Sequence, residues 1–452
     1  MKRSEIIDIY RFYYNKNAAK LFQAANLPVE KCGNGCYLED EEGKQYLDFC
    51  ASYGIFGLGY GHPKVRAAIM TELSAQPCVP MGFKPQASSR LLNQLKSILP
   101  PEMTSVYLTV SGSEAIEVAL RIANSIRPER RKIISLNNSY HGKTNGAMTV
   151  LGQPHLREPF GICDNETSFV PFNDLDALEK TIDKHTLAII AEPILGGGYI
   201  TLPTQGYLSK LRKLCDQYDV LLIIDEVQTG FGRTGKMFAI EHDAIVPDIL
   251  VISKGATGGH VPFAMVALHK NIKLAFKLSP AYQSGLKEID YFSFPIIAAA
   301  VSASIAVIKD ENLTQKAYET GLYLLEGLKK IAKQYPQFVL QATGIGLMTG
   351  IKVQNGLIEN AIWLQMLKRG VITGLSTNTH TSHPVLRFFP PLIVTGQEVD
   401  TALSVLEESL KELSRLPMPF WKVSNFIFRY QFYLPYQILR IGVNLLKNIP
   451  KF

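Results

Sequence analysis

Two ionisable side chains, one carboxylate and one amine, each follow a short apolar run. Asp225 comes directly after the run from Val220 to Ile224, and Lys254 comes two positions after the run from Ile249 to Ile252. Short runs of this kind, bounded by polar residues or glycine, predict buried strands. Ligands of open α/β sheets bind at the carboxyl ends of such strands. We therefore expect both side chains to face one crevice.

That pairing suits pyridoxal 5'-phosphate. The aldehyde of this cofactor needs a lysine for a Schiff base, and its ring nitrogen needs an anion to stay protonated. The segment IIDEVQTGFGRTG, with a lysine and a glycine beginning 29 residues after its aspartate, resembles the class III (ornithine and ω-amino acid type) aminotransferases. The resemblance implies an α/β protein of fold type I, with a large domain around a mostly parallel seven-stranded sheet and a smaller α+β domain.

The resemblance also implies roles for four residues of this region. Lys254 would form the Schiff base, Asp225 would hold the pyridine nitrogen, Val227 would pack on the ring and Gln228 would contact its phenolic oxygen. Without the resemblance, Asp225 could equally cap a turn and Lys254 could lie on the surface.

A second segment predicts a phosphate site. The predicted strand VYLTV runs into small residues and then into a helix, where free backbone N–H groups can receive a phosphate. The sequence SGSEA resembles the family's phosphate cradle, which implies that Gly112 and Ser113 bind the cofactor phosphate; Ser113 could also be a plain helix cap. The segment SYHG resembles the next family motif, which implies that Tyr140 stacks on the pyridine ring with His141 beside it.

Two further residues are assigned to the site. Glu192 ends an apolar run, and we place it with the cofactor-binding residues, near the substrate or neutralising an arginine. Many relatives have EPIQGEGG here, and the replacements Leu195 and Gly197 predict less polar substrate surroundings. The segment VLRFFPPL resembles LRFxPPL, which implies that Arg387 receives a substrate carboxylate through two parallel hydrogen bonds. A structural ion pair is the alternative role for Arg387.

One position departs from the family pattern. Asp290 stands where relatives have a threonine that reaches the phosphate from the neighbouring subunit. A carboxylate about 4 Å from a phosphate charge costs roughly 1 to 4 kcal/mol. We therefore expect Asp290 to point away from the phosphate or to weaken its binding, with Ser293 as a substitute ligand.

Three other interpretations fail on spacing. Gly230–Gly235 matches GxGxxG, but five residues separate it from the preceding apolar run, so a dinucleotide site is not predicted. Gly142–Thr144 lacks the glycine that a phosphate-binding P-loop needs at the position of Asn137. Cys32 and Cys36 have no second pair of ligands, so no metal site is predicted.

The length and the charge distribution of the chain predict its division into domains and limit its possible partners. The 452 residues favour two domains with extensions, and we divide them at 1–60 (joining the small domain and the substrate site), 61–300 (large, cofactor-binding), 301–415 (small) and 416–452 (tail). Residues 416–452 hold five basic residues and no acid, which leaves +2 of the net +7 for the rest. A nearly neutral body gives no support for nucleic-acid binding. The first residues lack the apolar core of a signal peptide, so we expect a cytoplasmic protein.

The predicted function is the transfer of an amino group from an amine or amino acid to an aldehyde or 2-oxo acid, by a homodimer. Decarboxylation, racemisation and an aminomutase reaction remain alternatives on the same residues, and a relative without cofactor that acts as a binding partner is a further one. The aromatic and basic tail could contact an anionic membrane surface or pack on the protein itself.

Overall fold

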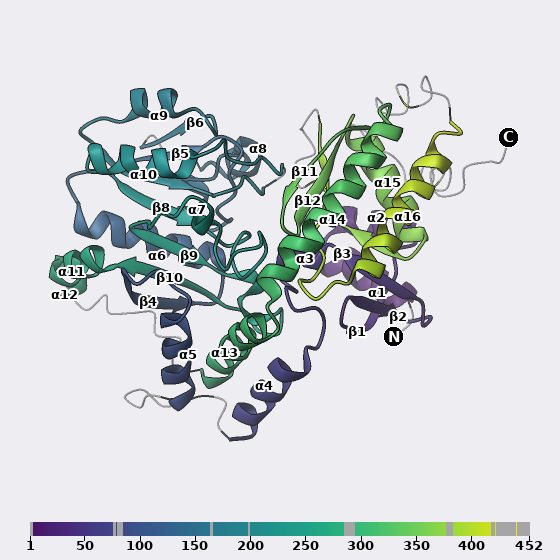
Figure 1. The fold of residues 1–452 in the computed structure, drawn as a ribbon, viewed down its shortest axis with the longest axis horizontal. Helices are drawn as coiled ribbons and strands as arrows, with labels where there is room; N and C mark the ends of the chain where they lie inside the picture. The colour runs from purple at the N-terminus through teal and green to yellow at the C-terminus, as the bar shows by residue number, and fades with distance from the viewer. Residues whose placement is uncertain are drawn as a thin grey trace.

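The computed structural model describes residues 3–75, 78, 85–162, 166–197, 199–283, 294–376, 383–416, 421 and 440. Within them, helices surround a central sheet in one half of the molecule, and two smaller sheets lie in the other half (Figure 1). Asp290, Ser293 and most of the tail fall outside the described residues, so the predictions for them stay predictions.

The large sheet has seven strands in the order β4-β10-β9-β8-β7-β5-β6. The pairs β9–β8, β8–β7, β7–β5 and β5–β6 are parallel, whereas β10 runs antiparallel to β9 and β4. The strands are β4 (Met103–Thr109), β5 (Lys132–Leu136), β6 (Thr167–Val170), β7 (Thr186–Ala191), β8 (Leu221–Asp225), β9 (Ile249–Ile252) and β10 (Ala264–His269). This confirms the predicted fold class, including the two strands that lead to Asp225 and Lys254.

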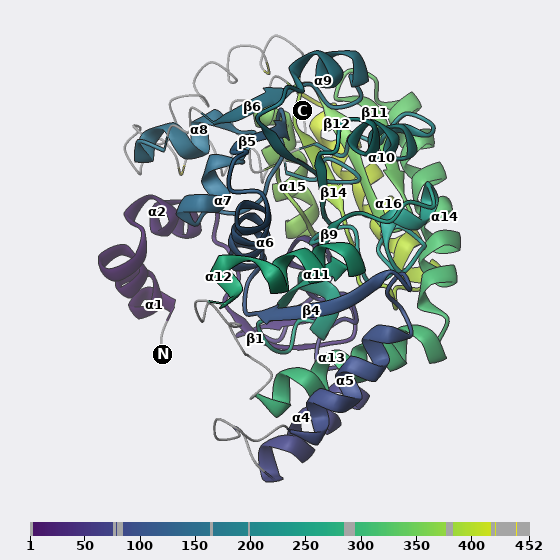
Figure 2. The ribbon, with the colours of Figure 1, turned by 90° about the vertical axis from the view of Figure 1, so that its left-hand side faces the viewer.

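Both faces of this sheet are buried, because successive side chains of a strand point to opposite faces. Leu221 and Ile223 of β8 join the core under α6, whereas Leu222 and Ile224 join the core on the other face. α6 packs on β9 and β10, α11 packs on β4 and β10, and α10 packs on β8 (Figure 2). The helices around the sheet are α6 (Gly112–Ile126), α7 (Asn145–Thr149), α8 (Pro154–Arg157), α9 (Leu175–Thr181), α10 (Tyr207–Gln217), α11 (Lys270–Leu278) and α12 (Pro280–Gln283).

The two smaller sheets combine distant parts of the chain. A four-stranded sheet has the order β1-β2-β3-β13, and its last strand runs parallel to β3. Its strands β2 and β3 form an antiparallel hairpin joined by residues 41–44. A three-stranded antiparallel sheet has the order β11-β12-β14. The strands are β1 (Glu30–Asn34), β2 (Tyr37–Asp40), β3 (Gln45–Phe49), β11 (Val339–Ile345), β12 (Met348–Val353), β13 (Val371–Thr373) and β14 (Val385–Phe388).

Long helices connect and cover these sheets. α13 begins with a proline at its first position, where a missing N–H costs nothing, and it packs between α4 and α5. α14 follows α13 in the chain and packs on β11, while α15 packs against α16 (Figure 1). The remaining helices are α1 (Arg3–Ile9), a π-helix (Tyr10–Tyr14), α2 (Lys16–Ala24), α3 (Ala51–Gly54), α4 (Pro63–Ala75), α5 (Gln86–Lys96), α13 (Pro295–Asp310), α14 (Leu313–Gln334), α15 (Gly356–Lys368) and α16 (Gly396–Leu413).

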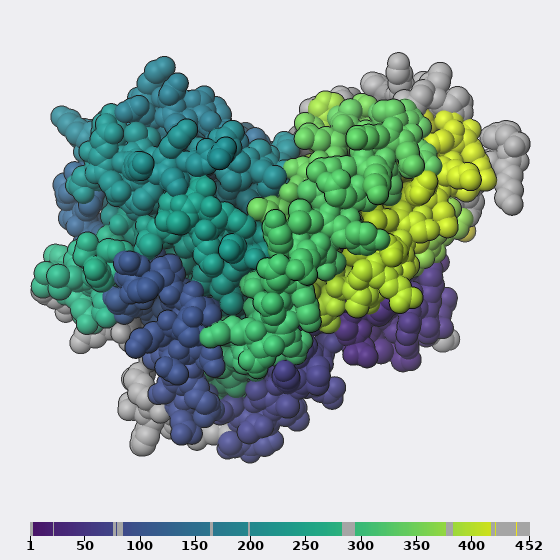
Figure 3. All heavy atoms as spheres, in the orientation of Figure 1, coloured from purple at the N-terminus to yellow at the C-terminus, as the bar shows by residue number. Residues whose placement is uncertain are grey.

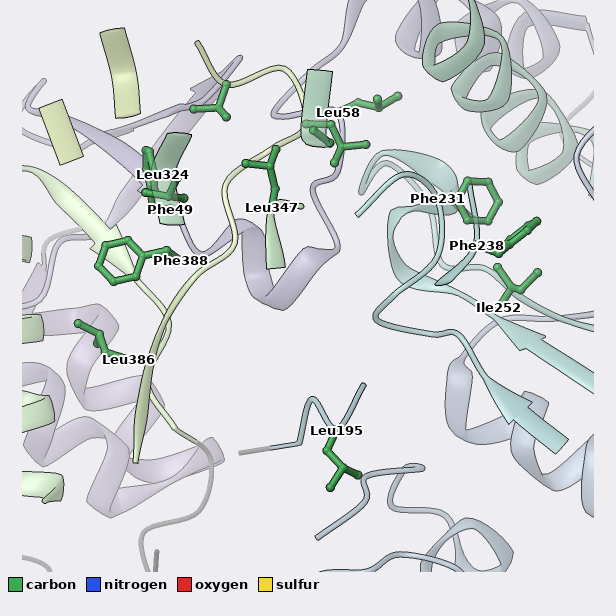
Figure 4. Close-up of a cluster of buried hydrophobic side chains, with 14 of the residues drawn as sticks. Phe49, Leu58, Leu195, Phe231, Phe238, Ile252, Leu324, Leu347, Leu386 and Phe388 are labelled. Atoms are coloured by element: carbon green, nitrogen blue, oxygen red, sulfur yellow. The ribbon is translucent and has the colours of Figure 1, made fainter. Parts of the chain in front are cut away.

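One hydrophobic core continues from the large sheet into the smaller ones. Ile252 and Phe388 belong to the same cluster although they lie on different sheets, and Figure 4 shows both with Leu347 between them. Phe49 and Phe388 meet edge to face with their ring centres 6.3 Å apart. The molecular surface is indented between the two halves in Figure 3. No helix among the described residues has the length and apolar character that a bilayer crossing requires.

Candidate active site

A single cavity of about 650 Å³ holds every site residue that the sequence predicts. Asp225 lies at the carboxyl end of β8, and Lys254 follows β9. The predicted residues that line the cavity are Gly112, Ser113, Tyr140, His141, Glu192, Asp225, Val227, Gln228, Lys254 and Arg387. The expectation that the carboxylate and the amine share one crevice is therefore confirmed.

The Asp225 carboxylate is fixed in place by two hydrogen bonds. Its Oδ2 lies 2.8 Å from Nδ1 of His141, and its Oδ1 accepts from the backbone N–H of Val227 at 3.0 Å. The side chains of Asp225 and His141 are both buried. A buried carboxylate held in this way presents a fixed negative charge to a cationic group in the cavity.

Lys254 has the properties of a lysine used for chemistry. It begins the short turn after β9 with φ of +46°, which a non-glycine residue rarely adopts. Burial lowers the pKa of its amine to about 8, while the charge of Asp225 acts in the opposite direction. A lowered pKa increases the fraction of neutral amine near neutral pH, and only the neutral amine can attack a carbonyl carbon.

The start of α6 forms a cradle of small residues. Ser111 caps the helix by accepting from the N–H of Glu114, and Gly112 and Ser113 begin the helix at the cavity wall. The backbone N–H of Lys143 donates to Ser113 Oγ at 3.3 Å. Gly142 has φ of +120°, and a Cβ there would overlap the Ser113 side chain. First-turn N–H groups with a lysine beside them suit a phosphate group.

Glu192 organises the cavity wall between two backbone segments. Its Oε1 accepts from the N–H of Tyr140 at 2.8 Å, and its Oε2 accepts from the N–H of Gly196 at 3.1 Å. Burial raises the pKa of this carboxyl group to about 7. Its hydrogen bonds go to backbone groups, so the expected neutralisation of an arginine is not what positions it.

At two positions after Glu192, Gly196 and Gly197, neighbouring side chains leave no room for a Cβ atom. A Cβ at Gly196 would overlap Oε1 of Gln228, and a Cβ at Gly197 would lie 2.5 Å from Nε2 of Gln153 and 2.7 Å from Cβ of Tyr140. Close packing of Tyr140 and Gln153 therefore leaves no room for a side chain at residue 197.

Arg387 presents an open edge of its guanidinium to the cavity. It lies on β14 and is 2% exposed, and its carbon Cζ lies 5.2 Å from the ring centre of Tyr53. Within the described part of the chain, its Nε and Nη2 have no hydrogen-bond partner. Burial lowers the pKa of Arg387. Nε and Nη2 share one edge of the group, which is the geometry that grips a carboxylate with two parallel bonds.

Part of the wall was not predicted residue by residue. Ser52, Tyr53 and Ile55 line the cavity, and the chain reaches it through three consecutive left-handed residues, Ala51 to Tyr53. The Tyr53 hydroxyl donates to the carbonyl of Leu375 at 3.1 Å. No glycine occurs from Ala51 to Tyr53, so the sequence contains no sign of this turn.

The fold and the cavity define a fold type I transferase with a lysine–aspartate centre. The family model described as aminotransferase class-III matches residues 20–410 of the chain. The chain belongs to this family, and it is an aminotransferase.

Relatives and solved structures agree with this assignment. Putrescine aminotransferase of Pectobacterium atrosepticum is 33% identical over 386 residues, covering 83% of this chain and 81% of that protein. Acetylornithine aminotransferase of Methanosarcina acetivorans is 33% identical over 378 residues, covering 83% and 90%. The crystal structure of ornithine aminotransferase from Toxoplasma gondii superposes with a TM-score of 0.79 at 27% identity, covering 86% of this chain and 91% of that one. Amino transfer is thereby favoured over the other reactions and over a non-catalytic role.

Proposed function

We propose that this aminotransferase binds pyridoxal 5'-phosphate in the cavity between β8, β9 and α6. When bound, this cofactor supplies the aldehyde that accepts an amino group and a ring that takes up electrons. The first turn of α6 at Gly112 and Ser113 would hold the phosphate, and Tyr140 and Val227 would lie against the ring. Gln228, which also lines the cavity, would contact the phenolic oxygen. The fit is supported by the buried carboxylate of Asp225 and by the small residues of the cradle.

The protein's own groups would divide the chemistry. Asp225, held by His141, would keep the ring nitrogen protonated, because a buried carboxylate can form a charge-assisted hydrogen bond with it. Lys254 Nζ would take the proton from the amine-bearing carbon of the donor, and in the second half of the reaction it would give a proton to the former carbonyl carbon of the acceptor. The lowered pKa of Lys254, about 8, supports this role because a base must be neutral to accept a proton.

Arg387 is proposed to bind a carboxylate of the amino donor or of the 2-oxo acid acceptor. The observation that carries this part is the open Nε and Nη2 edge of a buried guanidinium in the cavity of Lys254. No salt bridge to Arg387 is formed by the described residues, although the charges of the buried Glu359 and Glu192 raise the pKa of Arg387 against the effect of burial; a structural role beside Glu359 is therefore the alternative that the test must separate.

The larger-scale features of the proposal come from the sequence. We propose the division at residues 60, 300 and 415, a homodimer that works in the cytoplasm, and a tail, residues 416–452, that contacts an anionic membrane surface. The concentration of five basic residues and nine aromatic residues in that tail supports the last point.

A set of matched donors tests the function. Purified protein should absorb in the visible range, and borohydride reduction should fix the cofactor to the peptide that contains Lys254. Each of pentylamine, 5-aminopentanoate and 1,5-diaminopentane should be offered with pyruvate or 2-oxoglutarate. We expect 5-aminopentanoate to be the best donor by at least ~10-fold, since a charge-assisted bidentate pair with Arg387 contributes about 1.5 to 3 kcal/mol.

Two results would overturn the proposal. A colourless protein that transfers no amino group from any donor contradicts the function itself. In the Arg387→Met variant, the advantage of 5-aminopentanoate over pentylamine should disappear. Equal losses with both donors would show instead that Arg387 is structural.

A further inference from the structure

Arg233 is a buried cation that the proposed chemistry does not use. It lies in the loop after β8, eight residues beyond Asp225, and is 3% exposed. Burial lowers its pKa to about 10. Within the described residues, Asp48 is the acid whose charge acts on it, and the oxygens of Asp48 already accept from the N–H groups of Cys50 and Ala51 and from the Tyr60 hydroxyl. An unpaired buried charge is costly, so its retention calls for an explanation.

The guanidinium of Arg233 bonds to the smaller sheet that carries Arg387. Its Nη1 donates to the carbonyl of Leu347 at 3.0 Å and to the carbonyl of Pro390 at 2.5 Å. Leu347 also donates in return: its backbone N–H bonds to the carbonyl of Arg233 at 2.9 Å. One side chain thus joins the loop after Asp225 to two separate backbone segments.

The carbonyl groups of Leu347 and Pro390 lie just beyond the paired part of β12 and β14. In the β12–β14 ladder, Gly350 pairs with Arg387 and Thr349 pairs with Phe388. Continuing this antiparallel register places Leu347 opposite Pro390. Arg233 therefore bridges both strands just beyond the ladder, three residues from Arg387.

The approach of the two parts is tight. A Cβ at Gly346 would lie 2.5 Å from the carbonyl carbon of Thr234 and 2.6 Å from the carbonyl oxygen of Arg233. The ring of Phe389 lies 6.0 Å from Arg233 Cζ. Leu347 itself belongs to the core that runs between the two halves (Figure 4). The contact leaves little room for β14 to shift relative to the loop after β8.

We propose that Arg233 is a positioning residue, which fixes the end of β14 against the loop after Asp225 so that the open edge of Arg387 faces the amine of Lys254. This rests on the proposed role of Arg387 as the carboxylate site. The distance between the carboxylate site and the reacting amine is then set by Arg233 rather than by the sheets alone. Small errors in such a distance reduce the use of a substrate strongly.

The test compares two donors that differ in the carboxylate. For Arg233→Met, the KM for 5-aminopentanoate should rise at least ~10-fold, while kcat/KM for pentylamine changes less than about two-fold. Binding of pentanoate, measured by calorimetry, should weaken by a similar factor. Visible absorbance should be unchanged. Arg233→Lys keeps a donor for the two carbonyls and should restore most of the affinity.

Arg212→Met is the matched control. Arg212 is also a largely buried arginine, but it pairs with Asp216 and Asp248 away from the cavity, so its loss should lower stability without separating the two donors. Equal losses for 5-aminopentanoate and pentylamine in Arg233→Met, or no change for either donor, would overturn the positioning role. If Arg233→Met does not fold, Arg233→Lys decides: a small rise in the KM for 5-aminopentanoate alone supports the role, and any other result overturns it. Failure of the proposed function looks different, because the wild-type protein would then transfer from neither donor.

Discussion

The ionisable residues of the cavity have environments that separate their chemical roles. Burial lowers the pKa of Lys254 to about 8 and raises that of Glu192 to about 7, so both groups change charge near neutral pH. Asp225 is instead held in place by hydrogen bonds to His141 and to the N–H of Val227. Perturbed groups of this kind, gathered in one cavity, are typical of active sites.

Stability should depend on pH through Lys254. Its pKa falls from 10.5 to about 8 on burial, so between these values the unfolded chain binds more protons and stability rises with pH. In cofactor-free protein, Lys254→Met should be more stable than the wild type at pH 7 by about 3 kcal/mol, with the difference shrinking toward pH 10. Urea unfolding at both pH values measures it. The exposed Lys64→Met serves as control; a difference independent of pH would contradict the burial argument.

Asp225→Asn should separate folding from catalysis. The amide keeps the size of the side chain but loses the charge opposite the ring nitrogen, so turnover should fall at least ~100-fold at saturating cofactor. Circular dichroism should show an unchanged fold. Asp248→Asn is a fitting comparison, since Asp248 pairs with Arg212 outside the cavity. Near wild-type turnover in Asp225→Asn would rule out the assigned role.

At the level of strands and helices, the sequence was informative where side-chain pattern decides structure. The apolar runs before Asp225 and Lys254 are β8 and β9, and the helix predicted after the strand VYLTV is α6. All ten site residues that the sequence motifs single out line one cavity.

Other features depend on tertiary contacts that no local pattern records. Shortly after β3, Ala51, Ser52 and Tyr53 all adopt the left-handed conformation, which these residue types do not favour. Arg233 lies within the GxGxxG segment, and its bonds to Leu347 and Pro390 join it to positions more than 100 residues away in the sequence. Local sequence cannot predict such contacts because their partners come from other sheets.

The α6 cradle yields a prediction about Gly142. Replacement by alanine places a Cβ onto the Ser113 side chain at φ of +120°. We expect Gly142→Ala to weaken cofactor binding at least ~10-fold, since the first turn of α6 must shift. Gly161→Ala is the control: its φ is +67° with nothing near the added Cβ, so it should lose about 1 kcal/mol of stability and no cofactor affinity. Fluorescence titration gives both affinities; equal affinities would show that the cradle tolerates the shift.

Across the whole molecule, both chain ends contribute to the half that carries Arg387. β3, near the N-terminus, pairs with β13, and the N–H of Phe389 donates to the carbonyl of Phe49 at 2.7 Å. Beyond α16, Trp421 is 1% exposed and meets Phe338 edge to face with ring centres 5.7 Å apart. The sequence assigned Trp421 to the tail, yet its side chain belongs to the core.

This placement decides how the membrane hypothesis for the tail should be tested. A chain ending at Arg415 would lose Trp421, and deletion of a buried tryptophan side chain costs about 3 to 5 kcal/mol. Instability of that chain would therefore say nothing about lipid. A chain ending at Trp421 keeps the core contact and removes all five basic residues of the tail.

Liposome flotation should compare full-length protein with the chain ending at Trp421. Each basic residue close to an anionic surface contributes about 1 kcal/mol, and a higher salt concentration screens this attraction. Full-length protein should float with anionic liposomes at low salt and be released by salt, whereas the shortened chain should stay at the bottom with its melting temperature unchanged. If full-length protein does not float, and the chain ending at Trp421 melts several degrees lower, residues 422–452 stabilise the protein by packing on it.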